Sequence, residues 1–271
     1  MSEFPTYETL ALDWCAPGVI ELALNRPEER NAITMPMHLE IVEALHQLHE
    51  QKDVGAVLLS GRGKSFCAGG SMEMIRDFAE ADWRATTRNL EQAWRLVQEL
   101  LMVRPPIVAA VQGAAIGLGA TLALLSDVIV AADDAVIADT HVKAGVVAGD
   151  GGTLIWPAVL GPARAKEFLM TGRRVTGADA QALGLVNYAV AADEVRAKAL
   201  ELASELAGGA RQAIAWTKQV VNASLLREAM AQMPLAVSLE ARTMLQPDVQ
   251  EGTRAFLERR APNWPSHEPE R

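Results

Sequence analysis

Short apolar runs alternate with longer stretches of helical spacing along the first half of the chain. Residues 19–24, 54–60, 107–111 and 128–132 are apolar and of strand length, so they are predicted to be buried strands. A polar stretch of helical spacing, residues 72–101, separates the second run from the third. This alternation of strand and helix predicts parallel pairing with helical crossovers, and therefore an α/β fold.

The first predicted helix carries the signals of a helix start. Thr34 is a typical N-cap residue, and Pro36 suits the first turn. An apolar stripe at helical spacing follows, made of Ile41, Val42, Leu45 and Leu48. From about residue 163 the chain is predicted to be helical almost to its end, in segments near 193–207, 210–223, 224–245 and 248–260. We therefore predict a core over residues 1–195 and a helical region over residues 196–271.

The composition fits a globular protein and excludes several classes. The chain has 271 residues, half of them hydrophobic, which is enough for one large core. A net charge of −9 argues against nucleic-acid binding, which needs clustered Lys and Arg. No apolar stretch reaches the roughly 20 residues of a membrane span. The N-terminal residues contain no apolar run of the kind a secretory signal needs. The chain has only two cysteines. We therefore expect a cytoplasmic protein without a disulfide framework.

Two glycine-rich loops are the first candidates for chemistry. CAGGS occupies residues 67–71 and GLGA residues 117–120, each between a predicted strand and a predicted helix. Glycine lets a ligand approach the backbone closely, and the first N–H groups of a helix lack intrahelical partners. Two such helix starts facing one point would stabilise a developing negative charge. Each loop alone also has a purely structural interpretation, and a phosphate loop fails because its first glycine would fall on Leu58.

Five segments match, in order and spacing, the motifs of one known family. They are LNRPEERNAI (24–33), VLLSGRGKSFCAGGSMEMI (57–75), PPIVAAVQGAAIGLGATLALLSDVIVAADDAVIA (105–138), GDGGT (149–153) and FLERRAP (256–262). On these motifs the chain resembles the crotonase superfamily, the enoyl-CoA hydratase/isomerase family. The resemblance implies a spiral of ββα units with parallel sheets and crossover helices, followed by a helical C-terminal region that forms trimers, often paired into hexamers. A stripe on that region is predicted to form the trimer core, at Met230, Met233, Leu235 and Leu239.

The resemblance also implies a ligand and the residues that bind it. The ligand is an acyl-CoA thioester, with coenzyme A as part of the substrate and no separate cofactor, and its carbonyl is expected at the N–H groups of Gly70 and Leu118. CoA contacts are implied for Arg26, Lys64, Ser65, Cys67 and Ala68 and, across a subunit boundary, for Phe256 and Arg259. The acyl group is expected near Met72, Met74, Ile75, Phe78, Val146 and Trp156. These side chains suggest that the acyl group is apolar.

The sequence departs from the family where its hydratases carry two catalytic glutamates. Those positions hold Thr121 and His141, so hydration by the usual glutamate pair is not expected. Asp150, in AGDGG, is the predicted substitute, because a carboxylate in a water-poor cleft can serve as base or acid. An Asp at or near this position is catalytic in some relatives, a dehalogenase among them. His141 could shuttle a proton near neutral pH, and Thr121 could hold a water molecule.

Each of these three residues also has a structural alternative that the sequence leaves open. Asp150 could belong to a turn or cap a helix, His141 could be a core histidine with satisfied hydrogen bonds, and Thr121 could bond back within its own helix. No metal site is predicted, because His46 and His49 lack acidic or cysteine partners at a suitable spacing.

Three hypotheses about function follow. In the first, the chain is an enoyl-CoA hydratase-like lyase in which Asp150 and His141 transfer protons. In the second, the same site performs isomerisation, C–C hydrolysis or dehalogenation, the last through attack of Asp150 on carbon. In the third, the chain binds acyl-CoA without catalysis.

Overall fold

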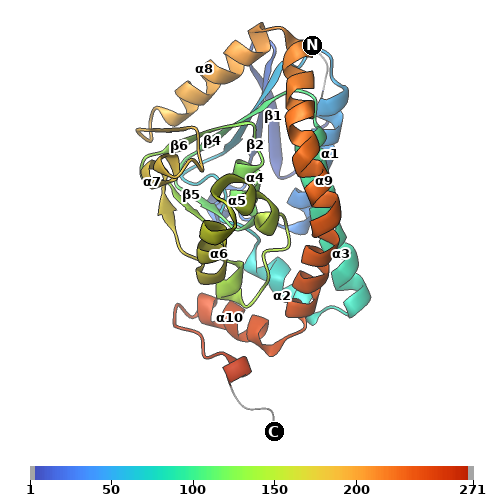
Figure 1. Cartoon of the computed structure of the whole chain (residues 1–271), viewed down its shortest axis with the longest axis vertical. Coiled ribbons are helices and arrows are strands. Elements are labelled where there is room, and N and C mark those ends of the chain that lie inside the picture. Colours follow the sequence, from blue (N-terminus) through green and yellow to red (C-terminus); the bar gives the residue numbers. More distant parts are fainter. Residues whose placement is uncertain (1–3, 268–271) are drawn as a thin grey trace.

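The computed structural model describes residues 4–267. Its largest sheet has six strands in the order β1-β2-β3-β4-β6-β9 (Figure 1). Its strands are β1 Leu10–Ala16, β2 Val19–Leu24, β3 Ala56–Gly61, β4 Ile107–Val111, β6 Val128–Ala132 and β9 Tyr188–Val190. β1 pairs with β2 in antiparallel fashion, and every other neighbouring pair is parallel. The four strands predicted from apolar runs are therefore confirmed as β2, β3, β4 and β6, and so is the parallel sheet.

A second, smaller sheet follows directly from the first. Its strands are β5 Ala114–Ile116, β7 Val136–Ala138 and β8 Val175–Thr176. The chain passes from β4 to β5 through Gln112 and Gly113. Gly113 has a φ of +63°, and a Cβ there would lie 2.1 Å from the carbonyl oxygen of Lys64, so this position requires glycine. These strands have only two or three residues, which is too short for an apolar pattern, so the sequence did not predict them.

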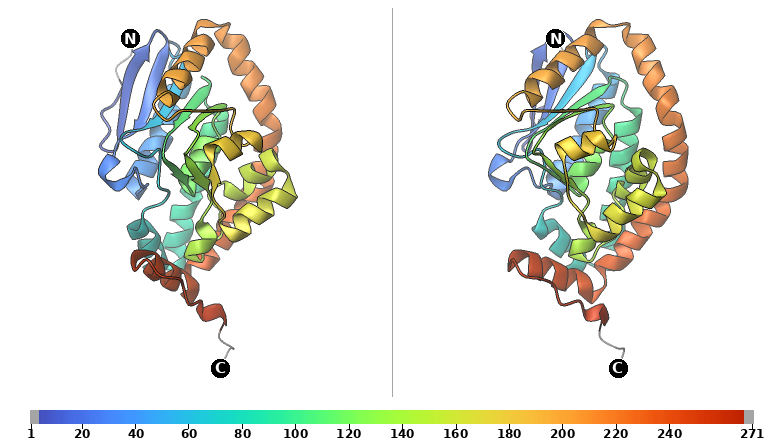
Figure 2. Two further views of the ribbon diagram at one scale, coloured as in Figure 1. Left: turned by 90° about the vertical axis from the view of Figure 1, so that its left-hand side faces the viewer. Right: turned by 60° about the vertical axis from the view of Figure 1, so that its left-hand side comes forward.

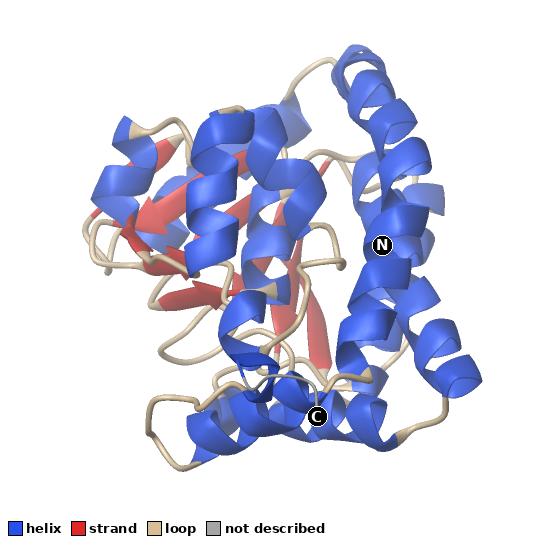
Figure 3. Ribbon diagram, turned by 60° about the horizontal axis from the view of Figure 1, so that its bottom comes forward, coloured by secondary structure: helices blue, strands red, loops and turns tan. Residues whose placement is uncertain are grey.

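Helices enclose both sheets (Figure 3). In the first two thirds of the chain they are α1 Met35–Glu50, α2 Met72–Glu80, α3 Trp83–Met102, α4 Leu118–Leu124, α5 Gly152–Leu160, α6 Pro162–Thr171 and α7 Gly177–Ala182, with short 3-10 turns at Pro27–Glu29 (η1) and His141–Ala144 (η2). Thr34 caps α1 as predicted, since its side chain accepts a hydrogen bond from the N–H of Met37. The single helix predicted over residues 72–101 is instead two helices, because Asp82 accepts the N–H of Ala85 and so starts α3.

Three further helices, α8 Val195–Gly208, α9 Arg211–Met244 and α10 Pro247–Leu257, pack on the chain's own core, and a last 3-10 turn (η3) spans Pro265–His267. α8 lies on β3, β4 and β6, α9 runs beside α3, and α10 crosses one end of the molecule next to α2 and η2 (Figure 2). The segments predicted over 210–223 and 224–245 are one continuous helix, because residues 222–224 contain neither glycine nor proline. A buried ion pair fastens α9 to the sheet, since Lys218 Nζ lies 2.7 Å from Asp127 Oδ2.

The stripe predicted on α9 does not form one face. Met233 is buried within the chain, whereas Met230, Leu235 and Leu239 are exposed, because α9 packs one side on α3 and α5. An oligomer interface on the exposed side stays a prediction. Among the helices of residues 4–267, none combines the length and apolarity that a membrane crossing requires.

One buried side chain ties the turn after β2 to the first glycine-rich loop. The carbonyl oxygen of the Asn31 amide accepts the backbone N–H of Arg26 at 2.9 Å. The Asn31 Nδ2 donates to the carbonyl oxygens of Arg62, Ser65 and Phe66 at 2.9, 2.9 and 3.1 Å. Asn31 is fully buried, so three carbonyl groups rely on a single amide.

We predict that Asn31→Asp destabilises the protein. The new carboxylate would face three carbonyl oxygens without a donor, and burying such a group typically costs about 3 kcal/mol or more. For a chain of this size the loss corresponds to a fall in Tm of roughly 6 to 12 °C by differential scanning calorimetry. The matched control is Gln47→Glu on α1, where the amide is exposed and bonds only Glu43. Equal, small changes in both variants would contradict this account of Asn31.

Candidate functional site

A cavity of about 530 Å³ opens where α2, α4, α9 and α10 converge with η2. One wall is backbone, from Gly69, Gly70, Gly117 and Leu118 of the two glycine-rich loops. Apolar side chains of α2 form another part of the lining, at Met72, Met74, Ile75 and Phe78. Polar side chains enter from η2, from the loop before α5 and from α9, at His141, Asp150 and Glu240. The two loops singled out in the sequence therefore meet at one cavity.

The backbone N–H groups of Gly70 and Leu118 lie outside the regular hydrogen bonding of the strands and helices. Leu118 is the first residue of α4, so its N–H has no partner inside the helix. Gly70 lies at an isolated parallel bridge in which Ile33 bonds the peptides on either side of it. Within the described residues no acceptor is recorded for either N–H. The close approach of the two loops depends on Gly69, because a Cβ there would lie 2.7 Å from the carbonyl oxygen of Ile116.

His141 is held between two carboxylates. Its Nδ1 lies 2.7 Å from Asp139 Oδ1, and its Nε2 lies 3.1 Å from Asp150 Oδ2. Asp139 follows β7 directly and is fully buried, while Asp150 comes from the loop before α5 and is 5% exposed. The backbone N–H of His141 also donates to Asp139 at 3.2 Å, which fixes the turn that carries the ring. Residues from two separate loops thus form one hydrogen-bonded chain at the cavity.

The contacts with neighbouring charges determine the protonation of His141 and Asp150. Burial by itself would lower the pKa of His141, but the adjacent carboxylates of Asp150 and Asp139 raise it well above its usual range. Burial acts to raise the pKa of Asp150, but the His141 cation and the Gly152 N–H outweigh it and hold that pKa below its usual value. Near neutral pH the pair is therefore an imidazolium facing a carboxylate. The ring can give a proton, and the carboxylate can accept one.

Thr121 lies behind this pair, away from the cavity lining. Its hydroxyl is fully buried on α4 and approaches Asp150 Oδ1 at 3.5 Å, a long contact. The predicted role of holding a water molecule in the cavity has no support in this position. The structure instead places Thr121 where it can orient Asp150.

Asp139, His141 and Asp150 also offer ligand atoms within 4.8 Å of one another, a spacing that a cation would accept. The imidazole, however, lies between the two carboxylates, and each ring nitrogen is bonded to a different one. The geometry is that of a proton-sharing chain, in which Asp139 fixes the ring and its tautomer.

Several polar residues at the site were not predicted from the sequence, among them Asp139, Glu240 and His38. Asp139 has a signal, since it stands two positions before His141. Glu240 has one too, because it interrupts the buried apolar positions of α9 at Val237 and Met244. His38 of α1 also lines the cavity; its Nε2 meets the carbonyl oxygen of Gln92 at 3.0 Å, and burial lowers its pKa, so it is neutral.

The other predicted ligand-binding residues fall into two groups. Ala68, Met74 and Phe256 line the cavity, and Phe256 does so in its own chain, whereas contact across a subunit boundary was expected. A second group lies outside the lining, at Arg26, Lys64, Ser65, Cys67 and Arg259, and CoA contacts there stay predictions. The Cys67 thiol itself is unreactive, because burial raises its pKa to about 12.

The predicted acyl pocket needs one correction. Val146 lines the cavity as expected, but Trp156 does not. The indole of Trp156 is fully buried and packs in a tilted arrangement against Phe168, with 5.4 Å between ring centroids, so it belongs to the packing of α5 on α6.

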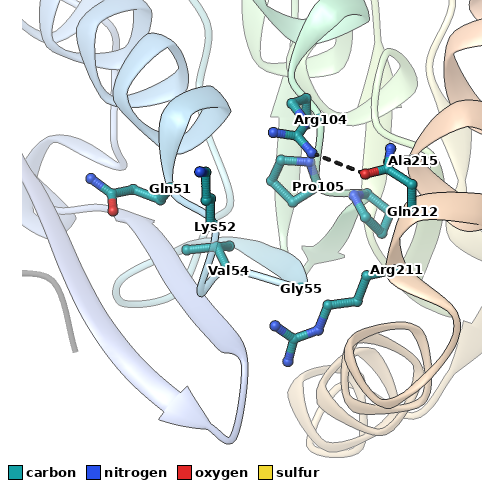
Figure 4. A pocket seen from close by; sticks show the side chains of 10 residues that line it. Gln51, Lys52, Val54, Gly55, Arg104, Pro105, Arg211, Gln212 and Ala215 are labelled. Carbon is teal, nitrogen blue, oxygen red and sulfur yellow. Dashed lines mark hydrogen bonds between the residues drawn. The ribbon is translucent and has the colours of Figure 1, made fainter.

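A second hollow, of about 350 Å³, lies at the N-terminal end of α9 (Figure 4). Its charged side chains are the cations Lys52, Arg104 and Arg211, and Arg104 reaches Gln212 at 3.5 Å. It lacks a carboxylate or histidine to move a proton, and none of the predicted site residues lines it. The candidate site is therefore the cavity that contains His141.

Comparison with known proteins gives one consistent result. The family model described as Enoyl-CoA hydratase/isomerase matches residues 15–267. A probable enoyl-CoA hydratase of Mycobacterium leprae is 34% identical over 95% of this chain and 98% of its own. A probable mitochondrial enoyl-CoA hydratase of Dictyostelium discoideum is 32% identical over 90% of this chain and 86% of its own. The solved structure of an enoyl-CoA hydratase/isomerase from Mycobacterium paratuberculosis superposes with a TM-score of 0.87 at 30% identity, covering 93% of this chain and 99% of that one.

We predict that Glu240 makes stability depend on pH. Burial first, and the nearby Asp150 charge second, raise its pKa from 4.5 to about 8. The unfolded chain releases this proton above pH 4.5 while the folded protein keeps it, so stability is lost as pH rises through this window. Between pH 5 and 7.5, Glu240→Gln should gain about 3 kcal/mol relative to the wild type, measured by urea unfolding at each pH. Glu43→Gln on the exposed face of α1 is the control, and a pH-independent difference for Glu240→Gln would contradict the assignment.

Proposed function

The chain belongs to the enoyl-CoA hydratase/isomerase family of the crotonase superfamily, and from this premise we propose that it adds water to an enoyl-CoA thioester with a histidine–aspartate pair. The observation that carries the proposal is the contact of His141 Nε2 with Asp150 Oδ2 at 3.1 Å, on a cavity that also includes Gly70 and Leu118. A proton donor, a proton acceptor and two backbone donors are thus on one surface.

The backbone donors would stabilise the negative charge that develops on the thioester. In this proposal the carbonyl oxygen binds the N–H groups of Gly70 and Leu118, so attack at C3 yields an enolate held by two hydrogen bonds. The N-terminal end of α4 adds a favourable dipole at that oxygen. Each such donor is typically worth about 3 kcal/mol in the transition state.

The protons balance within the pair. Asp150 accepts a proton from the attacking water as its oxygen bonds to C3. The pair then holds two protons, one on His141 and one on Asp150, and gives one of them to C2 of the enolate. The product is the 3-hydroxyacyl thioester, and the pair returns to an imidazolium facing a carboxylate. Asp139 and Thr121 act as positioning residues, the first through the ring of His141 and the second through Asp150.

The remaining parts of the proposal concern CoA and assembly. Arg26 and Lys64 are proposed to contact CoA near the mouth of the cavity, together with Phe256 of α10. A homotrimer, or a hexamer of two trimers, is proposed to cover the exposed apolar side chains of α9, which include Trp216, Val220, Met230 and Leu235.

We predict that hydration depends on both members of the pair. The assay follows loss of the conjugated thioester absorbance for trans-2-enoyl-CoA esters of increasing acyl length, crotonyl-CoA among them. Asp150→Asn and His141→Gln should each lower kcat about 100-fold or more, because positioned acid–base groups typically supply 10²–10⁴-fold. The affinity for CoA esters should change little. His46→Gln is the matched control, since His46 is an exposed histidine of α1.

Two outcomes would contradict the proposal. Turnover that survives in both site variants would remove the pair from the reaction. A folded wild-type protein that binds these esters but hydrates none of them would exclude hydration. If the protein binds these esters without hydrating them, mass spectrometry of the quenched protein tests for a covalent adduct on Asp150. Such an adduct would identify Asp150 as a nucleophile.

A further inference from the structure

One buried acid at the cavity has no role in the proton transfer described above. Glu240 comes from α9, lines the cavity and is only 4% exposed. Its Oε2 has no hydrogen-bond partner among the described residues and packs on Gly149, where a Cβ would lie 2.6 Å from it. No hydrogen bond joins the Glu240 side chain to His141 or Asp150 in the described structure.

The surroundings keep this acid uncharged. The charged groups that act on it are Asp150, Asp139 and His141, and no lysine or arginine is among them. Burial and the Asp150 carboxylate raise the pKa of Glu240 to about 8, so near neutral pH it is a carboxylic acid with an O–H to donate. An uncharged acid in a protein interior is costly unless an oxygen or nitrogen atom pairs with it.

Apolar side chains make up much of the cavity lining, and its polar side chains apart from Glu240 include Asn89, Lys143 and Arg174. Met74, Ile75 and Phe78 of α2 and Met244, one turn after Glu240 on α9, line the same cavity. A buried polar group at a fixed place in such a lining orients a ligand that carries a matching polar atom. A carboxylate placed beside Glu240 would be repelled by Asp150, and the cations of the lining, Arg30, Lys143 and Arg174, are not among the charges that act on Glu240. The matching atom is therefore uncharged.

We propose that Glu240 is a specificity-determining residue that selects acyl groups bearing a neutral oxygen, a hydroxyl or a carbonyl, beyond the reacting C2–C3 bond. This inference rests on the proposed function only for the orientation of the ligand in the cavity, in which the thioester carbonyl binds the N–H groups of Gly70 and Leu118. It changes the expectation of a purely apolar acyl group that the sequence suggested. A site built to pair a ligand oxygen discriminates strongly against the analogue that lacks it.

The test is a binding measurement that does not involve hydration. Saturated octanoyl-CoA and its 4-, 5-, 6- and 7-hydroxy derivatives are titrated by isothermal calorimetry at pH 7 into the wild type, Glu240→Leu and Glu240→Gln. The wild type should bind at least one hydroxy isomer about 10-fold more tightly than octanoyl-CoA. Glu240→Leu should lose that preference and bind octanoyl-CoA at least as tightly as the wild type. Glu240→Gln, which keeps a donor, should retain part of the preference, and Glu228→Leu, at an exposed glutamate of the same helix, is the matched control that should keep all of it.

The outcomes separate this inference from the proposed reaction. Equal affinities of the wild type for all five esters would overturn it, as would a preference that persists in Glu240→Leu. A shifted pH profile of turnover in Glu240→Gln with unchanged ligand preference would also overturn it, because Glu240 would then act in proton transfer. A retained preference in a protein that fails to hydrate enoyl-CoA would leave the inference standing and reject hydration.

Discussion

The chemistry of the cavity depends on the hydrogen-bonded chain Asp139–His141–Asp150. An imidazole between two buried carboxylates keeps its proton at neutral pH, although burial alone would remove it. Asp139 is fully buried and holds the ring from one side, so the other ring nitrogen is presented to Asp150. The site therefore holds a proton donor, the imidazolium of His141, beside a proton acceptor, the carboxylate of Asp150.

The fold brings these groups together through its shortest elements. β7 ends at Ala138, so Asp139 and His141 leave the second sheet directly at the cavity. Gly117, just before α4, lies against the ring of His141 and has a φ of +54°, a backbone conformation that favours glycine. The long helix α9 closes the site from the other side and adds Glu240. The large parallel sheet provides the support, while the three-residue strands position the reacting groups.

The sequence predicted most of the large elements but less of the site. The strands β2 and β4 and the cap at Thr34 could be predicted because apolar runs and capping side chains act locally. His141 and Asp150 could be named from their places in family motifs, yet their contact depends on two loops folding toward each other. Asp139 and Glu240 were not predicted, because the contacts and the protonation of a buried acid depend on neighbours that are distant in sequence. Trp156 was misplaced for the same reason: an apolar residue near the motifs can face the core as readily as the ligand.

The proposed reaction depends on proton transfer at C2 of an enolate that the N–H groups of Gly70 and Leu118 stabilise, with the His141–Asp150 pair as proton donor and acceptor. The most direct measurement is exchange of the C2 hydrogens of a saturated ester, hexanoyl-CoA, in D₂O, followed by loss of their proton NMR signal. The account predicts exchange catalysed by the wild type and at least about 100-fold slower in Asp150→Asn. Binding of hexanoyl-CoA without exchange, or equal exchange rates in the wild type and Asp150→Asn, would contradict it.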